Sequence, residues 1–178
     1  MSRRIQPIPR DLFIRMPHSG EDHFAQTFRA KADLMDLWPC VVGFFEIGEV
    51  LSAICIRNTR TYPIVANLQL LHTFAKHRRK GLARELVLNG YRSIRRQTVL
   101  GLGGPEYFRV SSEPDAAAFY RSLGLKFWGR QKSGSLLCIH RIRGDEPSTG
   151  EYKLDAFIES QLHSGRRGSL VETFSEPH

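Results

Sequence analysis

The chain has 178 residues, of which 41% are hydrophobic, and its formal net charge is +8. This length and composition suit one domain with a hydrophobic core rather than two. No run of 18 apolar residues occurs, so no membrane-spanning segment is expected. The charged, proline-broken start lacks the apolar stretch of a secretory signal, which predicts a cytoplasmic protein.

The N-terminal part predicts a helix and then a hairpin. The first 20 residues contain three prolines and can supply at most a short edge strand. Residues 21–37 predict a helix, and two β-rich runs at 41–45 and 50–56 predict a hairpin before a loop at 58–63. The apolar face of the expected helix holds Phe24, Phe28, Ala32 and Met35.

The three cysteines predict buried thiols. Cys40, Cys55 and Cys138 lie far apart in apolar surroundings, a pattern that does not suit a disulfide framework or a metal site. We therefore expect no metal and a reducing compartment.

The middle of the chain predicts a strand, a basic turn and a helix. Residues 67–73 are dense in leucine, and an apolar stripe follows over 82–96. Between them lies the run Arg78-Arg79-Lys80-Gly81-Leu82-Ala83. Backbone N–H groups at a helix N-terminus have no partner within the helix and attract phosphate, and a glycine lets a ligand approach the main chain closely. The pattern indicates a pyrophosphate cradle, although an ordinary basic helix start has the same composition.

The C-terminal part predicts a strand at 107–110, a helix from Pro114 to Gly124, and a hairpin of 126–130 with 136–143. From residue 144 the composition shifts to Asp, Glu, Pro, Ser and Gly. This acidic extension, 144–178, predicts a helix over 151–163 and a disordered tail after it.

Two segments resemble a known family. Arg78-x-x-Gly81-x-Ala83 after a strand is similar to the R/Q-x-x-G-x-G/A signature of the GNAT superfamily of N-acetyltransferases. The run SEPDAAAFYRSLGL, from Ser112, resembles the later family motif N-x-x-A-x-x-F/L-Y-x-x-x-G-F. The two elements cover about residues 65–142. The resemblance implies an α/β GNAT-like domain over 1–143, with a mixed sheet of about six to seven strands flanked by helices and splayed at the motif strand.

The same resemblance implies an acetyl-CoA site. The backbone of the motif strand would bind the pantetheine arm through Leu71, His72 and Thr73. Arg78 would open the loop, and the pyrophosphate would sit on the amides of Arg79, Lys80, Gly81, Leu82 and Ala83. Tyr120 aligns with the family tyrosine that protonates the departing thiolate, although a core tyrosine would also fit its helix. Glu113 stands where the family often has Asn in contact with the pantetheine arm.

The general base is not evident. The family often carries Glu or His on the acceptor side of the motif strand, where this chain has Asn67 and Gln69. Strand alternation directs His72 to the opposite face, and Glu46 lies at the hairpin. A chain of water molecules would also serve as a proton path, and an amine that arrives neutral would need no base.

Three functions remain open. The first is an N-acetyltransferase, a monomer or homodimer, that acts on a primary amine of a small molecule or peptide by direct attack in a ternary complex. The second is the same scaffold acting on a nucleic-acid-linked amine, such as a charged tRNA or a modified base. It rests on surplus basic residues near the last strands: Arg109, Arg130, Lys132, Arg141 and Arg143. The third is a coenzyme-binding module without catalysis.

Overall fold

The computed structural model describes residues 4–15, 23–142, 154–163 and 170–174. The strands are β1 (Gln6–Pro7), β2 (Val41–Glu46), β3 (Glu49–Asn58), β4 (Val65–Thr73), β5 (Tyr107–Ser112), β6 (Gly129–Gln131), β7 (Leu136–Arg141) and β8 (Leu170–Thr173). The helices are α1 (Arg10–Arg15), α2 (His23–Leu34), α3 (Leu82–Val99), α4 (Ala117–Arg121) and α5 (Ala156–His163). Short 3-10 turns are η1 (Trp38–Cys40), η2 (Ala75–His77) and η3 (Pro114–Ala116).

The strands form one mixed sheet in the order β1-β2-β3-β4-β5-β7-β6-β8. The mixed sheet, flanked by helices, confirms the predicted fold class, with eight strands where six to seven were expected. The motif strand β4 occupies a central position in this order. A helical crossover through α3 predicts that β4 and β5, which are neighbours in this order, run parallel.

The chain divides into two compact units. The first unit comprises residues 1–57 and 68–92, and the second comprises 58–67 and 93–178. Strand β4 belongs to both, because its first three residues fall in the second unit and the rest in the first.

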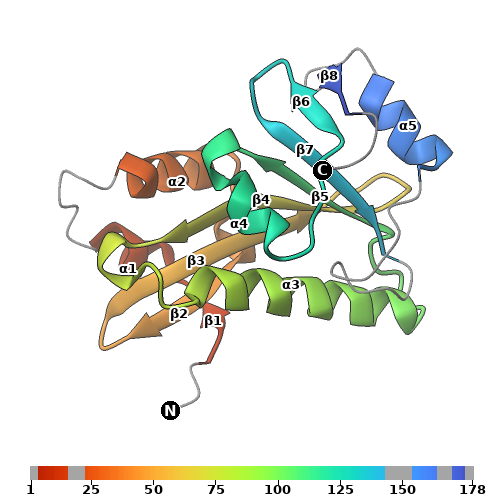
Figure 1. Cartoon of the computed structure of the whole chain (residues 1–178). Coiled ribbons are helices and arrows are strands. Elements are labelled where there is room, and N and C mark those ends of the chain that lie inside the picture. The colour runs from red at the N-terminus through yellow and green to blue at the C-terminus, as the bar shows by residue number, and fades with distance from the viewer. Residues whose placement is uncertain (1–3, 16–22, 143–153, 164–169, 175–178) are drawn as a thin grey trace. The chain divides into compact units, whose positions relative to one another are not determined.

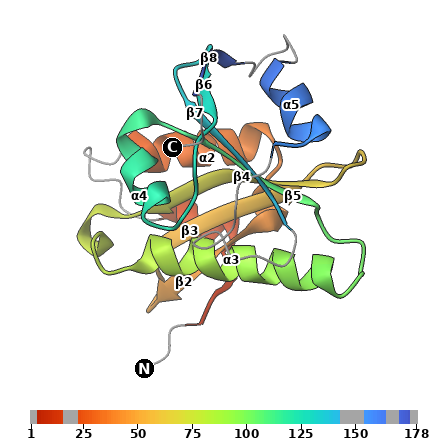
Figure 2. The same cartoon turned by 45° about the vertical axis from the view of Figure 1, so that its right-hand side comes forward.

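The first unit is built on the β2–β3 hairpin and most of β4. Ile47 and Gly48 make its two-residue turn with φ angles of 48° and 75°, the left-handed geometry that follows the twist of paired strands. Helices α1 and α2 lie on the opposite face of these strands from α3 (Figures 1 and 2). Phe13 of α1 and Phe28 of α2 stack at 4.9 Å between ring centroids in the core on that face.

Helix α1 corrects the expectation of nothing more than an edge strand in the first 20 residues. The edge strand exists, since β1 pairs with β2. Pro9 precedes the helix, where its missing N–H costs nothing, and the Phe13 amide donates to the Pro9 carbonyl at 3.2 Å. Phe13 is fully buried, so tertiary packing stabilises six residues that are too few for an independent helix.

The second unit contains the start of β4 together with β5, β7, β6 and β8, which pair antiparallel from β5 onward. Gly124 has φ 83° just after α4, the left-handed C-terminal position predicted for it. From the C-terminal extension, α5 packs through Ile158 and Leu162 into a core with Trp128. Strand β8 contradicts the prediction of a wholly disordered tail: Thr173 lies opposite Gly129 of β6.

The expectation of buried thiols holds for two of the three cysteines. Cys55 and Cys138 are fully buried and Cys40 is partly so, and all three are free thiols. None of the described helices is long and apolar enough to cross a membrane. No cluster of three metal-ligating side chains occurs in the described ranges.

Candidate functional site

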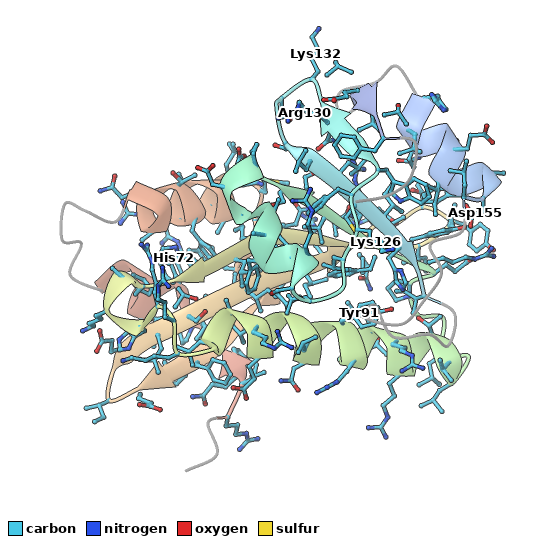
Figure 3. All side chains as sticks on the ribbon, in the orientation of Figure 1. His72, Tyr91, Lys126, Arg130, Lys132 and Asp155 are labelled. Carbon is cyan, nitrogen blue, oxygen red and sulfur yellow. The ribbon has the colours of Figure 1, made fainter. Side chains whose placement is uncertain are left out.

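Strand β4 alternates regularly between two environments. Leu68, Leu70 and His72 are buried, whereas Asn67, Gln69, Leu71 and Thr73 are half-buried. The His72 ring lies 4.8 Å from the Phe74 ring and 6.4 Å from that of Phe28 in α2 (Figure 3). The alternation places His72 on the face opposite Asn67 and Gln69, as the sequence predicts.

The end of β4 is held by polar side chains. The Ser52 hydroxyl, fully buried on β3, donates to the His72 carbonyl at 2.8 Å and lies 2.8 Å from the Thr73 hydroxyl. Arg78 donates from Nε to the Thr73 carbonyl at 3.1 Å. Arg78 therefore ties the loop back onto the strand, and two of the carbonyls expected to face a ligand already accept one hydrogen bond each.

A row of unpaired backbone amides follows Arg78 in the chain. Among the described residues, the backbone N–H groups of Arg79 to Ala83 donate to no protein acceptor, and the first bond of α3 runs from Glu85 N–H to Gly81 C=O at 3.0 Å. Arg79 and Gly81 have φ angles of 59° and 78°. Consecutive N–H groups in such left-handed turns converge into an anion-binding concavity at the positive end of a helix. The loop therefore has the donors that a pyrophosphate needs.

Gly81 keeps this concavity open. A Cβ on Gly81 would meet no atom within 4 Å, so the space in front of the residue is empty. The positive φ also makes glycine the residue of lowest strain at this position. Both observations fit close approach of a phosphate to the backbone.

The basic side chains of the loop divide into two groups. Lys76 forms an ion pair with Glu49 at the start of β3, and His77 Nε2 lies 3.4 Å from the same carboxylate. Lys76 is the main cause that lowers the pKa of Glu49. Arg79 and Lys80 are exposed and take part in no ion pair within the described residues. They are the two cations of the loop that can meet an external anion.

Tyr120 lies in the second unit on α4. Its side chain is 6% exposed, and its ring contacts that of Phe119 with 5.0 Å between centroids. A buried tyrosine usually hydrogen-bonds its hydroxyl, yet the described residues offer Tyr120 no partner. Burial raises the pKa of the phenol above its ordinary value. The hydroxyl is protonated and available to an external group.

Glu113 precedes η3 and is exposed, with one weak contact at 3.5 Å from the Ser135 hydroxyl. It caps nothing, because its side chain makes no hydrogen bond to the turn. The structure therefore gives no geometric reason for a contact with the pantetheine arm, and that contact stays a prediction.

No family model matches the chain, and no curated protein matches it in sequence. Solved structures do match. A putative acetyltransferase of the GNAT family from Desulfovibrio desulfuricans is 16% identical with a TM-score of 0.59, covering 80% of this chain and 99% of its own. The fold is that of the GNAT acetyltransferases. The PaiA N-acetyltransferase of Thermoplasma acidophilum in complex with coenzyme A is 10% identical (TM-score 0.55; 79% and 99% covered). The NatC complex bound to Gag peptide and CoA is 11% identical (TM-score 0.53; 78% and 96% covered).

Proposed function

We propose that this GNAT-fold chain is an acetyl-CoA-dependent N-acetyltransferase that transfers an acetyl group to a primary amine of a small molecule or peptide. The observation that carries the proposal is the row of unpaired amides from Arg79 to Ala83 in front of α3. GNAT-fold structures that contain coenzyme A, including one with a peptide, support the donor and the acceptor class.

The residues of the loop fit the coenzyme. The amides of Arg79, Lys80, Gly81, Leu82 and Ala83 would hold the pyrophosphate, because N–H donors at a helix start bind phosphate without further help. Arg78 would act by positioning, since its bond to Thr73 fixes the loop on β4. The backbone of Leu71, His72 and Thr73 would bind the pantetheine arm.

Bound acetyl-CoA would supply the thioester carbon that the amine attacks. As the new C–N bond formed and the C–S bond broke, negative charge would develop on sulfur. Tyr120 would donate a hydrogen bond and then a proton to it, and the proton that the attacking nitrogen loses would return through water to the Tyr120 oxygen. Because its pKa is raised, Tyr120 is a reliable donor but a weak acid. We therefore assign it stabilisation of the thiolate as its main contribution.

None of the side chains suggested by the sequence is assigned as the general base. His72 is buried among aromatic rings, and Glu46 lies exposed at the end of β2. Neither Asn67 nor Gln69 can take a proton near neutral pH. We propose that the acceptor amine enters in its neutral form, so that the rate should rise with pH up to the pKa of the amine.

A nucleic-acid-linked acceptor is less well supported. Arg130 lies 3.3 Å from Glu172, and Arg141 lies 3.2 Å from Asp155, so acidic neighbours offset both charges. Arg109 is half-buried beside a pocket rather than on an open face. Lys132, at the tip of the β6–β7 hairpin (Figure 3), stays exposed. Arg143 lies outside the described residues.

Two measurements test the proposal. Calorimetry should show micromolar binding of acetyl-CoA, and mass spectrometry should detect acetylated products from a panel of polyamines, aminoglycosides and short peptides with free N-termini. Binding without transfer to any member would instead support a coenzyme-binding module. If the folded protein does not bind acetyl-CoA, both the N-acetyltransferase and the coenzyme-binding module are excluded. A tRNA or DNA shift that weakens with salt would favour the nucleic-acid-linked acceptor.

A further inference from the structure

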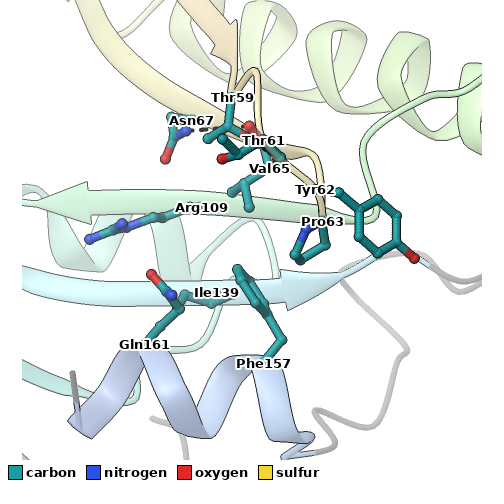
Figure 4. Close-up of a pocket in the computed structure, with 10 residues that line it drawn as sticks. All are labelled: Thr59, Thr61, Tyr62, Pro63, Val65, Asn67, Arg109, Ile139, Phe157 and Gln161. Carbon is teal, nitrogen blue, oxygen red and sulfur yellow. Dashed lines mark hydrogen bonds between the residues drawn. The ribbon is translucent and has the colours of Figure 1, made fainter.

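A pocket of about 260 Å³ lies within the second unit at the start of β4 (Figure 4). Its walls come from the loop at 59–63, from β4, β5 and β7, and from α5 of the C-terminal extension. Ligand sites for drug-sized molecules occupy about 300–1,000 Å³, so this pocket suits a smaller molecule, of about ten non-hydrogen atoms. The α5 helix makes the pocket dependent on the part of the chain that carries no family motif.

Arg109 is the charged side chain that lines the pocket. Its neighbours on β5, Phe108 and Val110, are fully buried on the other face, and strand alternation directs Arg109 toward the pocket. Ile139 of β7 lies opposite Arg109 in the register and also lines the pocket. The position of the guanidinium is therefore fixed by the sheet and not by a mobile loop.

Arg109 lacks a counter-ion among the described residues. Within the same ranges no carboxylate pairs with it and no hydrogen bond engages its side chain. Burial alone lowers the pKa of its guanidinium. Arg141 lies on β7, two residues beyond Ile139, the partner of Arg109 in the register. Its charge is paired with the carboxylate of Asp155. A half-buried arginine without a partner is costly in free energy, because water no longer solvates it fully and no anion replaces the water.

Two amides flank the guanidinium in Figure 4, one from each side in that view. Asn67 donates from Nδ2 to the Val65 carbonyl at 3.3 Å, which leaves its side-chain oxygen as an acceptor. The side chain of Gln161 on α5 has no hydrogen-bond partner among the described residues. Val65, Ile139 and Phe157 supply the apolar wall. The arrangement combines one cation, two amides and an apolar surface.

We propose that this pocket binds a small organic carboxylate, with Arg109 as the anion-binding residue and the apolar wall against the body of the ligand. A planar carboxylate matches the guanidinium fork with two parallel hydrogen bonds. The free Asn67 oxygen favours a ligand that carries a hydroxyl or amino group as well. The carboxylate site does not require the coenzyme, so this proposal is independent of the proposed acetyl transfer.

Binding is tested directly with matched probes. Benzoate, 4-hydroxybenzoate and phenylacetate are each compared with the corresponding primary amide, and inorganic phosphate is included as a second anion. Calorimetry or amide chemical-shift titration on the full chain, without coenzyme, gives the Kd. We expect at least one carboxylate to bind and its amide to bind at least about tenfold more weakly, because a charged hydrogen bond is lost.

Variants assign the site. Arg109→Gln should weaken carboxylate binding by about 10- to 100-fold, whereas Arg92→Gln, which removes the same charge from the exposed face of α3, should leave the Kd unchanged. Gln161→Leu should weaken it by a smaller factor. Chemical-shift changes should cluster on β5, β7 and α5.

Four outcomes would overturn the proposal. They are no carboxylate binding at millimolar concentration, equal binding of carboxylate and amide, unchanged binding in a folded Arg109→Gln variant, and binding of phosphate alone. The comparison of carboxylate with amide uses the natural chain, so it decides the question even if Arg109→Gln does not fold. If Arg109 serves only to cover apolar surface with its stem, the variant will change stability and not ligand affinity.

Discussion

Replacing Gly81 tests the phosphate cradle most sharply. Gly81→Glu would place a carboxylate in the open space before the amides of α3, where it competes with phosphate for the same donors. Losing two charge-assisted hydrogen bonds, each about 1.5–3 kcal/mol, weakens binding by about 3–6 kcal/mol. This corresponds to a loss in acetyl-CoA affinity of about 100-fold or more. A non-glycine residue at φ 78° adds about 1–3 kcal/mol of strain to the fold.

A matched control separates strain from competition. Gly81→Asn places an uncharged side chain at the same position, and Asn tolerates the left-handed conformation better than most residues. We expect an affinity loss below about tenfold for Asn, measured by calorimetry beside urea unfolding of both variants. Pantetheine, which lacks the pyrophosphate, should bind both variants equally. A folded Gly81→Glu variant that keeps its acetyl-CoA affinity would refute the cradle.

Three further predictions concern single groups. Tyr120→Phe keeps the ring packing and should leave acetyl-CoA affinity unchanged while lowering kcat by about 100-fold; equal losses in binding and rate would make Tyr120 a wall of the site. Burial raises the pKa of both Cys55 and Cys138 to about 12, so a disulfide exchange reagent at pH 8 should modify Cys40 first, and rapid modification of all three would contradict the buried thiols. Burial, assisted by the hydrogen bond to Asp155, raises the pKa of Tyr107 to about 12 from an unfolded value of about 10. Its contribution to stability should be complete below pH 10 and fall between pH 10 and 12, and a Tyr107→Phe variant should lack that decline.

The strand–loop–helix element was predictable because its signals are local. The apolar stripe of α3, the glycine at its start and the leucines of β4 all act within a few residues, and the structure places each helix and strand boundary there within three residues. Gly81 adopts a positive φ, which glycine allows but which the sequence alone does not predict. The positive φ of Arg79 was not foreseen, because arginine carries no signal for the left-handed region.

The elements missed from the sequence depend on distant contacts. Helix α1 forms because Phe13 packs against Phe28, and β8 forms because it pairs with β6, from which it is 39 to 44 residues distant in the chain. Hydrophobic periodicity over four to six residues cannot reveal either. The pocket around Arg109 was invisible for the same reason, since four separate segments line it. The sequence groups Arg109 with the surface charges, and its burial without a counter-ion among the described residues distinguishes it from them.

Asp155 links the C-terminal extension to β5 and β7 within the second unit, and its substitution tests whether these contacts hold α5 in place. Its Oδ1 caps α5 by accepting from Ile158 N–H at 2.9 Å, and its Oδ2 accepts from the Tyr107 hydroxyl at 2.9 Å and lies 3.2 Å from Arg141.

Asp155→Ala removes the cap, about 1 kcal/mol, and leaves the Tyr107 hydroxyl unpaired, about 1–2 kcal/mol more. Asp155→Asn keeps the cap through its one amide oxygen, turns its N–H2 group toward the Tyr107 hydroxyl, which can accept from it, and loses the charge opposite Arg141. We therefore expect hydrogen exchange of the α5 amides to accelerate by about 30- to 150-fold in Asp155→Ala and by less than about tenfold in Asp155→Asn. Equal acceleration in both variants would mean that the ion pair, and not the cap and the tyrosine, holds α5 in place; no acceleration in either would mean that the apolar contacts of Ile158 and Leu162 suffice.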